Sequence, residues 1–137
     1  MIKLTLTGRP ITKKNSQIPI RTKSGKFFII QSKQYREYEK NCLIQIKEQF
    51  PWQISTALHP GIPVTGKVSL KALYYMPDRR LPDLLNLLQA TANIVEKAGV
   101  IENDKDIVSF DGSRIMGVDK ENPRVEIYIE EMMEVEC

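Results

Sequence analysis

The amino-acid sequence predicts an α+β fold, with a mostly antiparallel sheet and two main helices on one of its faces. Two kinds of periodicity support this class. Several short segments alternate apolar and polar side chains, as half-buried strands do. Two longer segments repeat apolar residues every three or four positions, as amphipathic helices do. Because 137 residues is the length of one ordinary domain, we expect a single domain over 1–137.

The N-terminal part of the chain predicts three strands and a helix. Alternation over Ile2–Leu6 predicts the first strand. Ile18–Arg21 and Phe27–Ile30 flank a turn rich in lysine and glycine, which predicts a hairpin with a basic tip. Residues 1–31 therefore form a basic N-terminal strand and hairpin. The apolar spacing in Lys33–Phe50 predicts the first helix, and a proline follows it.

The rest of the chain predicts a second helix between strands. Alternation predicts a long strand over Val64–Met76. An apolar stripe predicts a helix over Asp83–Lys97, and the glycine just beyond it suits a helix C-terminus. Two further strands are expected at Ile107–Met116 and Arg124–Ile129, before a frayed acidic tail at 130–137.

Charge is divided unevenly along the chain. Residues 1–50 hold eleven Lys/Arg and three Asp/Glu, a net charge of +8. Residues 51–137 hold nine against fourteen, a net charge of −5. This asymmetry predicts a polyanion-binding face in the N-terminal part. An ordinary solvated basic surface is the alternative.

Composition narrows the chemistry. No apolar run is long enough to span a membrane, and the N-terminus lacks signal-peptide features. Two cysteines make neither a disulfide framework nor a metal motif, so we expect a cytoplasmic protein. With His59 the only histidine, zinc sites and histidine acid–base chemistry are poorly supported. Catalysis would therefore use carboxylates, lysines or a hard metal ion.

Carboxylates at both ends of the second helix form a candidate metal site. Asp83 opens the helix, and Asp104 and Asp106 follow its end. If the chain returns along the helix, these acids could share Mg²⁺, with Mn²⁺ as a substitute. Arg79 and Arg80 precede the helix and suit binding to phosphates. The alternative is an ordinary N-cap, turn acids and solvated arginines.

Sequence motifs in this region carry a family resemblance. P-D-L-x-N-L at 82–87 is followed by K-A-G and then by the acidic segment N-D-x-D-I-V. An early G-R-P-I-T-K-K-N and a late N-P-R-V-E-I complete the pattern, from about Lys3 to Ile129. This pattern resembles the RusA-type endodeoxyribonucleases, the phage-derived Holliday-junction resolvases.

The resemblance implies a function and a set of site residues. It implies a homodimer that binds four-way DNA junctions in recombination and repair and nicks opposing strands symmetrically with Mg²⁺. The family's catalytic, metal-binding aspartates fall on Asp83 and Asp104, and its asparagine falls on Asn86 as a supporting residue. Lys13 and Lys14 resemble the family's basic loop and would contact the junction backbone.

Two positions depart from the family pattern. Leu85 stands where the family has a second aspartate, and Gln89 stands where it has a lysine. These departures suggest a metal site completed by Asp106 or Asp111, a weakened or inactive enzyme, or a subunit contact. A non-catalytic branched-DNA-binding protein of the same fold is therefore the alternative function. A third reading, a Mg²⁺-dependent hydrolase of small phosphorylated molecules, requires an enclosed pocket near Asp83.

Overall fold

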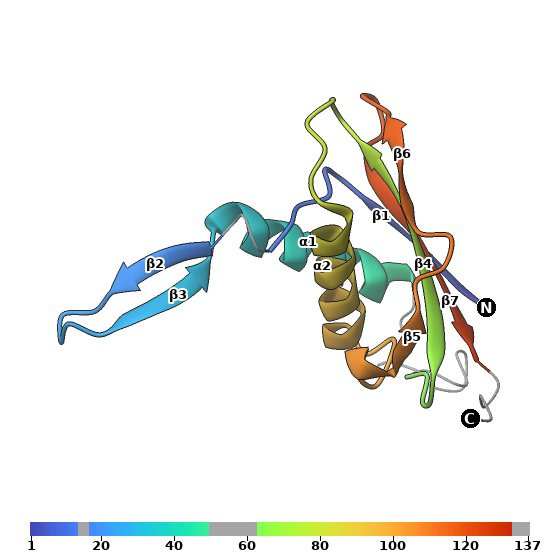
Figure 1. Ribbon diagram of the computed structural model, residues 1–137, viewed down its shortest axis with the longest axis horizontal. Coiled ribbons are helices and arrows are strands. Elements are labelled where there is room, and N and C mark those ends of the chain that lie inside the picture. The colour runs from blue at the N-terminus through green and yellow to red at the C-terminus, as the bar shows by residue number, and fades with distance from the viewer. Residues whose placement is uncertain (14–16, 50–62, 133–137) are drawn as a thin grey trace.

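The computed structural model describes residues 1–13, 17–49 and 63–132, with 17–20 and 27–31 described by their backbone alone. Figure 1 shows a twisted sheet, two helices and a projecting hairpin. In chain order the elements are β1 (Ile2–Thr7), β2 (Gln17–Arg21), β3 (Phe27–Gln31), α1 (Lys33–Gln49), β4 (Val68–Met76), α2 (Leu84–Lys97), the 3₁₀ turn η2 (Asp104–Asp106), β5 (Ile107–Ser109), β6 (Arg114–Val118) and β7 (Arg124–Glu131). None of the helices in the described part is long and apolar enough to cross a membrane.

The main sheet is mixed but mostly antiparallel, which confirms the predicted class. Its strand order is β1-β7-β4-β5, and β6 also pairs with β4. Both long pairings, β1 with β7 and β4 with β7, are antiparallel. The shorter strands β5 and β6 run parallel to β4, on the side of it away from β7. β4 is therefore the central strand of the sheet.

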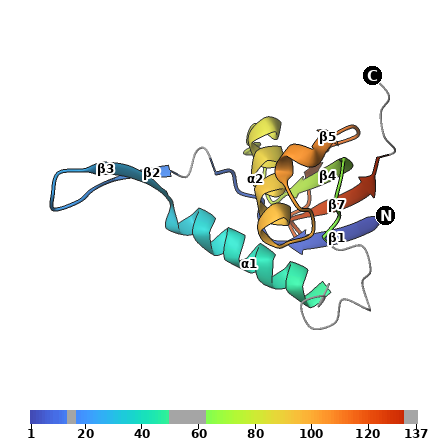
Figure 2. The same ribbon diagram turned by 90° about the horizontal axis from the view of Figure 1, so that it is seen from below.

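The core lies between this sheet and the two helices (Figure 2). Alternate residues of β4 are fully buried, as half-buried strands require. On α2 the buried residues include Leu87, Leu88, Thr91 and Val95, four members of the predicted apolar stripe. Leu84 packs partly buried against the same core. The spacing of apolar residues thus decides which face of α2 meets the sheet.

Several boundaries differ from the sequence prediction. The strand expected from Val64 begins at Val68, and Val64 forms only an isolated bridge to Ile101. The strand expected over 107–116 is divided into β5 and β6. The acidic tail begins later than expected, because β7 continues to Glu131. Phe50 and residues 133–137 lie outside the described residues.

A turn at Gly112 causes the division of β5 from β6. Its φ of 83° is in the left-handed region, and a Cβ there would lie 2.9 Å from the Lys71 side chain. Beside it, the Ser113 hydroxyl accepts a hydrogen bond from Ala72 N at 3.0 Å and donates to Leu70 O at 3.4 Å. The Ser113 side chain therefore takes the place of backbone hydrogen bonds to β4 between β5 and β6.

The hairpin of β2 and β3 forms a separate two-stranded sheet. Figures 1 and 2 show it extending away from the main sheet and leading into the start of α1. Its tip carries the exposed residues Lys23 and Lys26. The structure thus confirms the hairpin with a basic tip that the sequence predicts.

Candidate functional site

Asp83 is the N-cap of α2. Its backbone is extended (φ −66°, ψ 128°), and its Oδ1 accepts a hydrogen bond from Leu85 N at 2.8 Å. A carboxylate here satisfies a free N–H group and interacts favourably with the helix dipole. The side chain is exposed. The capping reading of Asp83 is therefore confirmed, and its location leaves it accessible to a solvent cation as well.

The acidic segment is attached to the other end of the same helix. Gly99, at a φ of 80°, lets the chain reverse after α2. Glu96, in the last turn of α2, then accepts a hydrogen bond from Asp104 N at 2.5 Å through its carboxylate. Asn103 caps the 3₁₀ turn by accepting from Lys105 N at 2.9 Å. Asp104 is thereby held against α2 rather than in a free loop.

A pocket of about 270 Å³ lies where the acidic segment meets α2. Asp104 lines it together with the helical residues Leu85, Gln89 and Asn93. These three are spaced four apart, so they share one face of α2. That face begins two positions after Asp83. The chain reversal therefore directs Asp104 toward the helix face that starts next to Asp83.

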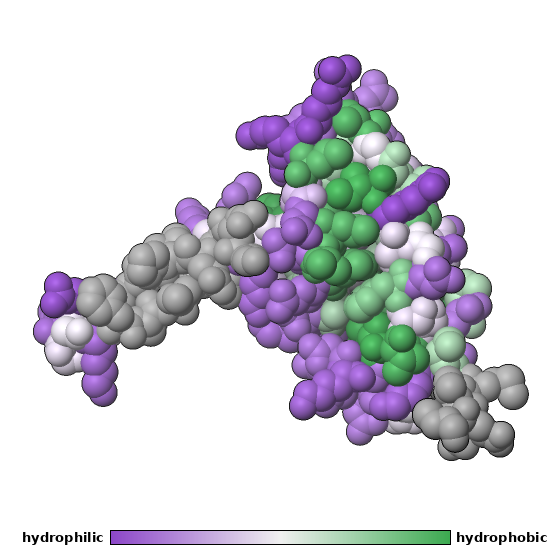
Figure 3. Space-filling view, viewed as in Figure 1, coloured by the Kyte–Doolittle hydropathy of each residue, from purple (hydrophilic) through white to green (hydrophobic). Residues whose placement is uncertain are grey.

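The rest of this pocket is apolar. Leu88, Ala92 and Phe110 complete its lining, and Leu85 is 74% exposed at its edge. Figure 3 shows hydrophobic residues gathered over α2 and the neighbouring strands on this side of the molecule. The pocket thus combines one carboxylate and two amides with an apolar wall.

Asp106 and Asp111 are not among the residues that line the pocket of Asp104. Asp106 points toward the start of β4, where its Oδ1 is 3.6 Å from Lys67 Nζ. Asp111 lines a different pocket, with Lys71 and Tyr128. Among the residues that the structure describes, no three His, Cys, Asp or Glu side chains are grouped to hold a metal ion. The expected three-carboxylate set is therefore not formed, and Asp83 and Asp104 remain as candidates.

Of the expected DNA-contacting residues, Arg79 and Arg80 lie directly before the N-terminus of α2. Arg79 is exposed, and Arg80 is exposed but paired with Asp78. Lys13 is half-buried in the connection after β1, whereas Lys14 lies outside the described residues. Asn86 is half-buried in the first turn of α2.

Sequence reasoning missed Arg9 and Asp78. They form an ion pair with Nη1–Oδ2 at 2.9 Å, joining the end of β1 to the loop before α2. The residues are far apart in the chain, so no local pattern indicates the pair. The signal that was available is the position of Asp78 directly before two arginines.

Comparison with known proteins relates this chain to a family of DNA-cutting enzymes. The family model described as Endodeoxyribonuclease RusA matches residues 7–130. One relative, the crossover junction endodeoxyribonuclease RusA of Aquifex aeolicus (strain VF5), is 31% identical over 103 residues, which cover 75% of this chain and 71% of the relative. The chain belongs to the RusA endodeoxyribonuclease family.

Proposed function

We propose that this chain acts on branched DNA as a Mg²⁺-dependent, structure-selective endonuclease, with Asp83 and Asp104 as its metal ligands. Membership of a family of crossover junction endodeoxyribonucleases supports the substrate class. The observation that carries the site assignment is the pocket in which Asp104 faces the side of α2 that begins at Leu85, next to Asp83.

The available side chains suit magnesium by type. Mg²⁺ binds through one or two carboxylates and completes its coordination with water and substrate phosphate oxygens. Asp83 uses one carboxylate oxygen as a helix cap and is exposed. Asp104 is half-buried and reaches solvent through the pocket. When bound, the ion would lower the pKa of a coordinated water and neutralise charge on the phosphate.

The protein's own residues would position the DNA. Arg79 and Arg80 precede the helix and would bind phosphates beside the scissile one. Lys13 and Lys14 would add contacts to the backbone, which give affinity without reading sequence. A four-way junction has approximate two-fold symmetry, so a homodimer would present two equivalent sites to it.

A second candidate function is binding of branched DNA without cleavage. Leu85 and Gln89 favour it, because they line the same pocket as Asp104 and occupy the positions of a family aspartate and lysine. The absence of a three-carboxylate group among the described residues points the same way. The third reading, a small-molecule hydrolase, is less well supported, because Asp83 is exposed rather than enclosed.

A cleavage assay on a synthetic four-way junction tests the proposal. We expect the wild-type chain to nick opposing strands in Mg²⁺ or Mn²⁺ but not in EDTA. Asp83→Asn and Asp104→Asn should each reduce the cleavage rate by about a hundredfold or more, since each removes a metal ligand. Junction binding in EDTA should persist, because each variant loses a negative charge near phosphate.

Glu102→Gln is the matched control, because Glu102 is an exposed carboxylate of the same acidic segment outside the pocket. It should cut as the wild type does. Undiminished cutting by both aspartate variants would contradict the site assignment. A wild type that binds junctions but never cuts, together with a Leu85→Asp/Gln89→Lys variant that does, would establish the non-catalytic alternative.

A further inference from the structure

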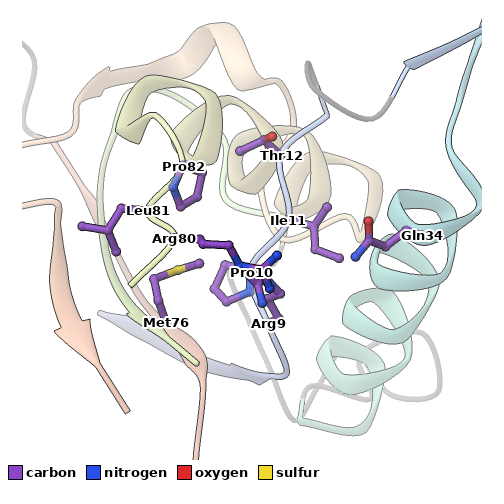
Figure 4. Close-up of a pocket in the computed structure, with 9 residues that line it drawn as sticks. All are labelled: Arg9, Pro10, Ile11, Thr12, Gln34, Met76, Arg80, Leu81 and Pro82. Atoms are coloured by element: carbon purple, nitrogen blue, oxygen red, sulfur yellow. The ribbon is translucent and has the colours of Figure 1, made fainter. Parts of the chain in front are cut away.

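A second pocket, of about 480 Å³, lies beside the N-terminus of α2. Its walls come from four segments: the connection after β1, the first turn of α1, the end of β4 and the loop before α2. The lining residues are Arg9, Pro10, Ile11, Thr12, Gln34, Met76, Arg80, Leu81 and Pro82 (Figure 4). Pro82 directly precedes Asp83, so this pocket adjoins the candidate metal site without being part of it.

One carboxylate holds two arginines in fixed positions at this pocket. Asp78 accepts from both terminal nitrogens of Arg9, with Nη1–Oδ2 at 2.9 Å and Nη2–Oδ1 at 3.2 Å. It also accepts from Arg80 through Nη2 at 3.0 Å, Nε at 3.3 Å and the backbone N at 2.9 Å. These hydrogen bonds from Arg9 and then Arg80 hold the pKa of Asp78 well below its usual range. The carboxylate is therefore ionised at neutral pH.

The cluster still has positive charge and donors to offer. Asp78 balances only one of the two guanidinium groups, so the three residues carry a net charge of +1. Each guanidinium has five N–H donors. Within the described part of the chain, Arg9 Nε and Arg80 Nη1 donate to no protein group. Figure 4 shows Arg9 and Arg80 in the middle of the residues that line the pocket, with Pro82 and Gln34 to either side of them.

The lining chemistry favours a phosphate over a base. Paired guanidinium groups match the geometry of phosphate oxygens. Single-stranded bases are usually held by stacking on aromatic rings. No aromatic side chain is among the described residues that line this pocket. The preferred ligand is therefore an anionic backbone group.

The geometry points to a phosphate-binding site in which Arg9 and Arg80, locked together by Asp78, hold a non-scissile backbone phosphate of the DNA. This inference rests on the proposed action on branched DNA. It names the residues that would hold the DNA strand next to Asp83. A phosphate bound here would fix the strand relative to the N-terminus of α2. Arg9 and Asp78 thereby become binding and positioning residues for the reaction.

Junction binding in EDTA, measured over a range of salt concentrations, tests the site. Arg80→Gln should weaken binding about tenfold and lower the salt slope by roughly 0.9, the loss of one phosphate contact. Arg36→Gln is the matched control, since Arg36 is an exposed arginine of α1 outside the pocket. It should weaken binding by about twofold or less, as expected for a charge that makes no direct phosphate contact in this pocket. Equal effects of the two variants would overturn the site.

The variant Asp78→Asn distinguishes binding at this site from general electrostatic attraction between the protein and DNA. Removing a negative charge should tighten DNA binding if only the total charge matters. A pocket that needs Asp78 to hold its arginines predicts weaker binding instead, with the melting temperature measured to confirm folding. Arg9→Lys keeps the charge and loses the planar fork, so it should also weaken binding. Tighter or unchanged binding by Asp78→Asn would contradict the proposal.

An NMR titration with inorganic phosphate distinguishes the possible failures. The Nε–H signals of Arg9 and Arg80 should shift in the wild type, and the junction should displace the phosphate. If the wild type binds no junction, the proposed function is refuted. Shifts induced by phosphate would in that case still identify an anion-binding site at this pocket. If phosphate shifts these signals but the junction does not displace the phosphate, the pocket binds free phosphate, and the proposed role in holding the DNA strand is wrong. If phosphate shifts neither signal, the pocket does not bind phosphate and the proposal is wrong.

Discussion

A buried hydrogen bond joins α2 to the central strand. Tyr74 Oη and Thr91 Oγ1 are 2.7 Å apart, and both residues are buried. Burial raises the pKa of Tyr74 well above its usual value, so the phenol stays neutral and can donate. Because neither group reaches water, each depends on the other for its hydrogen bond. The pair therefore fixes how α2 lies on β4 close to the candidate site.

We expect Thr91→Val to lower the free energy of unfolding by about 1–3 kcal/mol, because it leaves the Tyr74 hydroxyl buried and unpaired. Urea denaturation measures the change. The double variant Tyr74→Phe/Thr91→Val should recover most of the loss, since it removes both polar groups. If the loss of unfolding free energy in the double variant equals the sum of the losses in the two single variants, the two hydroxyl groups do not depend on each other.

Two glutamines of α1 cover the free edge of β1. Gln45 accepts from Thr7 N at 2.8 Å and donates to Thr7 O at 3.1 Å. Gln49 accepts from Thr5 N at 3.2 Å and donates to Thr5 O at 2.8 Å. The two side chains thus take the place of a neighbouring strand. Unpaired edge strands are sites of unwanted pairing, so these glutamines protect the sheet against it.

Replacing both glutamines should have two effects. Gln45→Ala/Gln49→Ala should lower the free energy of unfolding by about 1–3 kcal/mol, at roughly 1 kcal/mol or less for each exposed hydrogen bond lost. It should also increase self-association, measured by sedimentation velocity, because the edge of β1 is opened. Glu48→Ala, at an exposed position of the same helix, is the control. A double variant as stable and as monodisperse as this control would contradict the edge-protection role.

Sequence periodicity was sufficient for the regular elements. The spacing of Leu87, Leu88, Thr91 and Val95 identified the buried face of α2, because burial along a helix follows its 3.6-residue period. Periodicity alone missed the division of β5 from β6, although the dipeptide Asp111-Gly112 there is an ordinary turn signal. How the two halves meet β4 depends on contacts between distant positions, such as the hydrogen bonds of Ser113 with Ala72 and Leu70. Local patterns thus define elements better than they define pairing between them.

Across the whole molecule, only the hairpin among the described elements separates from the rest of the fold, because β1 and α1 of the basic N-terminal part pack into the body. The hairpin from the basic N-terminal part extends from the body, with Lys23 and Lys26 at its exposed tip (Figure 1). The candidate acidic residues lie around α2. This separation suits an extended polyanion that contacts the hairpin and the helix at once. It agrees with the charge asymmetry along the sequence.

Only part of the candidate site was predictable from the sequence. The sequence indicated that Asp83 opens α2 and that the chain reverses after Gly99, and the structure has both features, with Asp104 beside that helix. The inclusion of Asp106 depended on which way a short turn points, and its pairing with Lys67 was not visible in the sequence. The arginine pocket joins four segments, so it exists only once the chain has folded.

We propose that Asp83 and Asp104, from segments at opposite ends of α2, hold one divalent ion between them. The most direct measurement is paramagnetic broadening of backbone amide NMR signals by substoichiometric Mn²⁺, which needs no DNA and no activity. We expect signals at 83–86 and at 103–105 to broaden together in the wild type, and both groups to remain sharp in Asp83→Asn and in Asp104→Asn. Broadening of only one group, or of both groups in either variant, would contradict a shared ion.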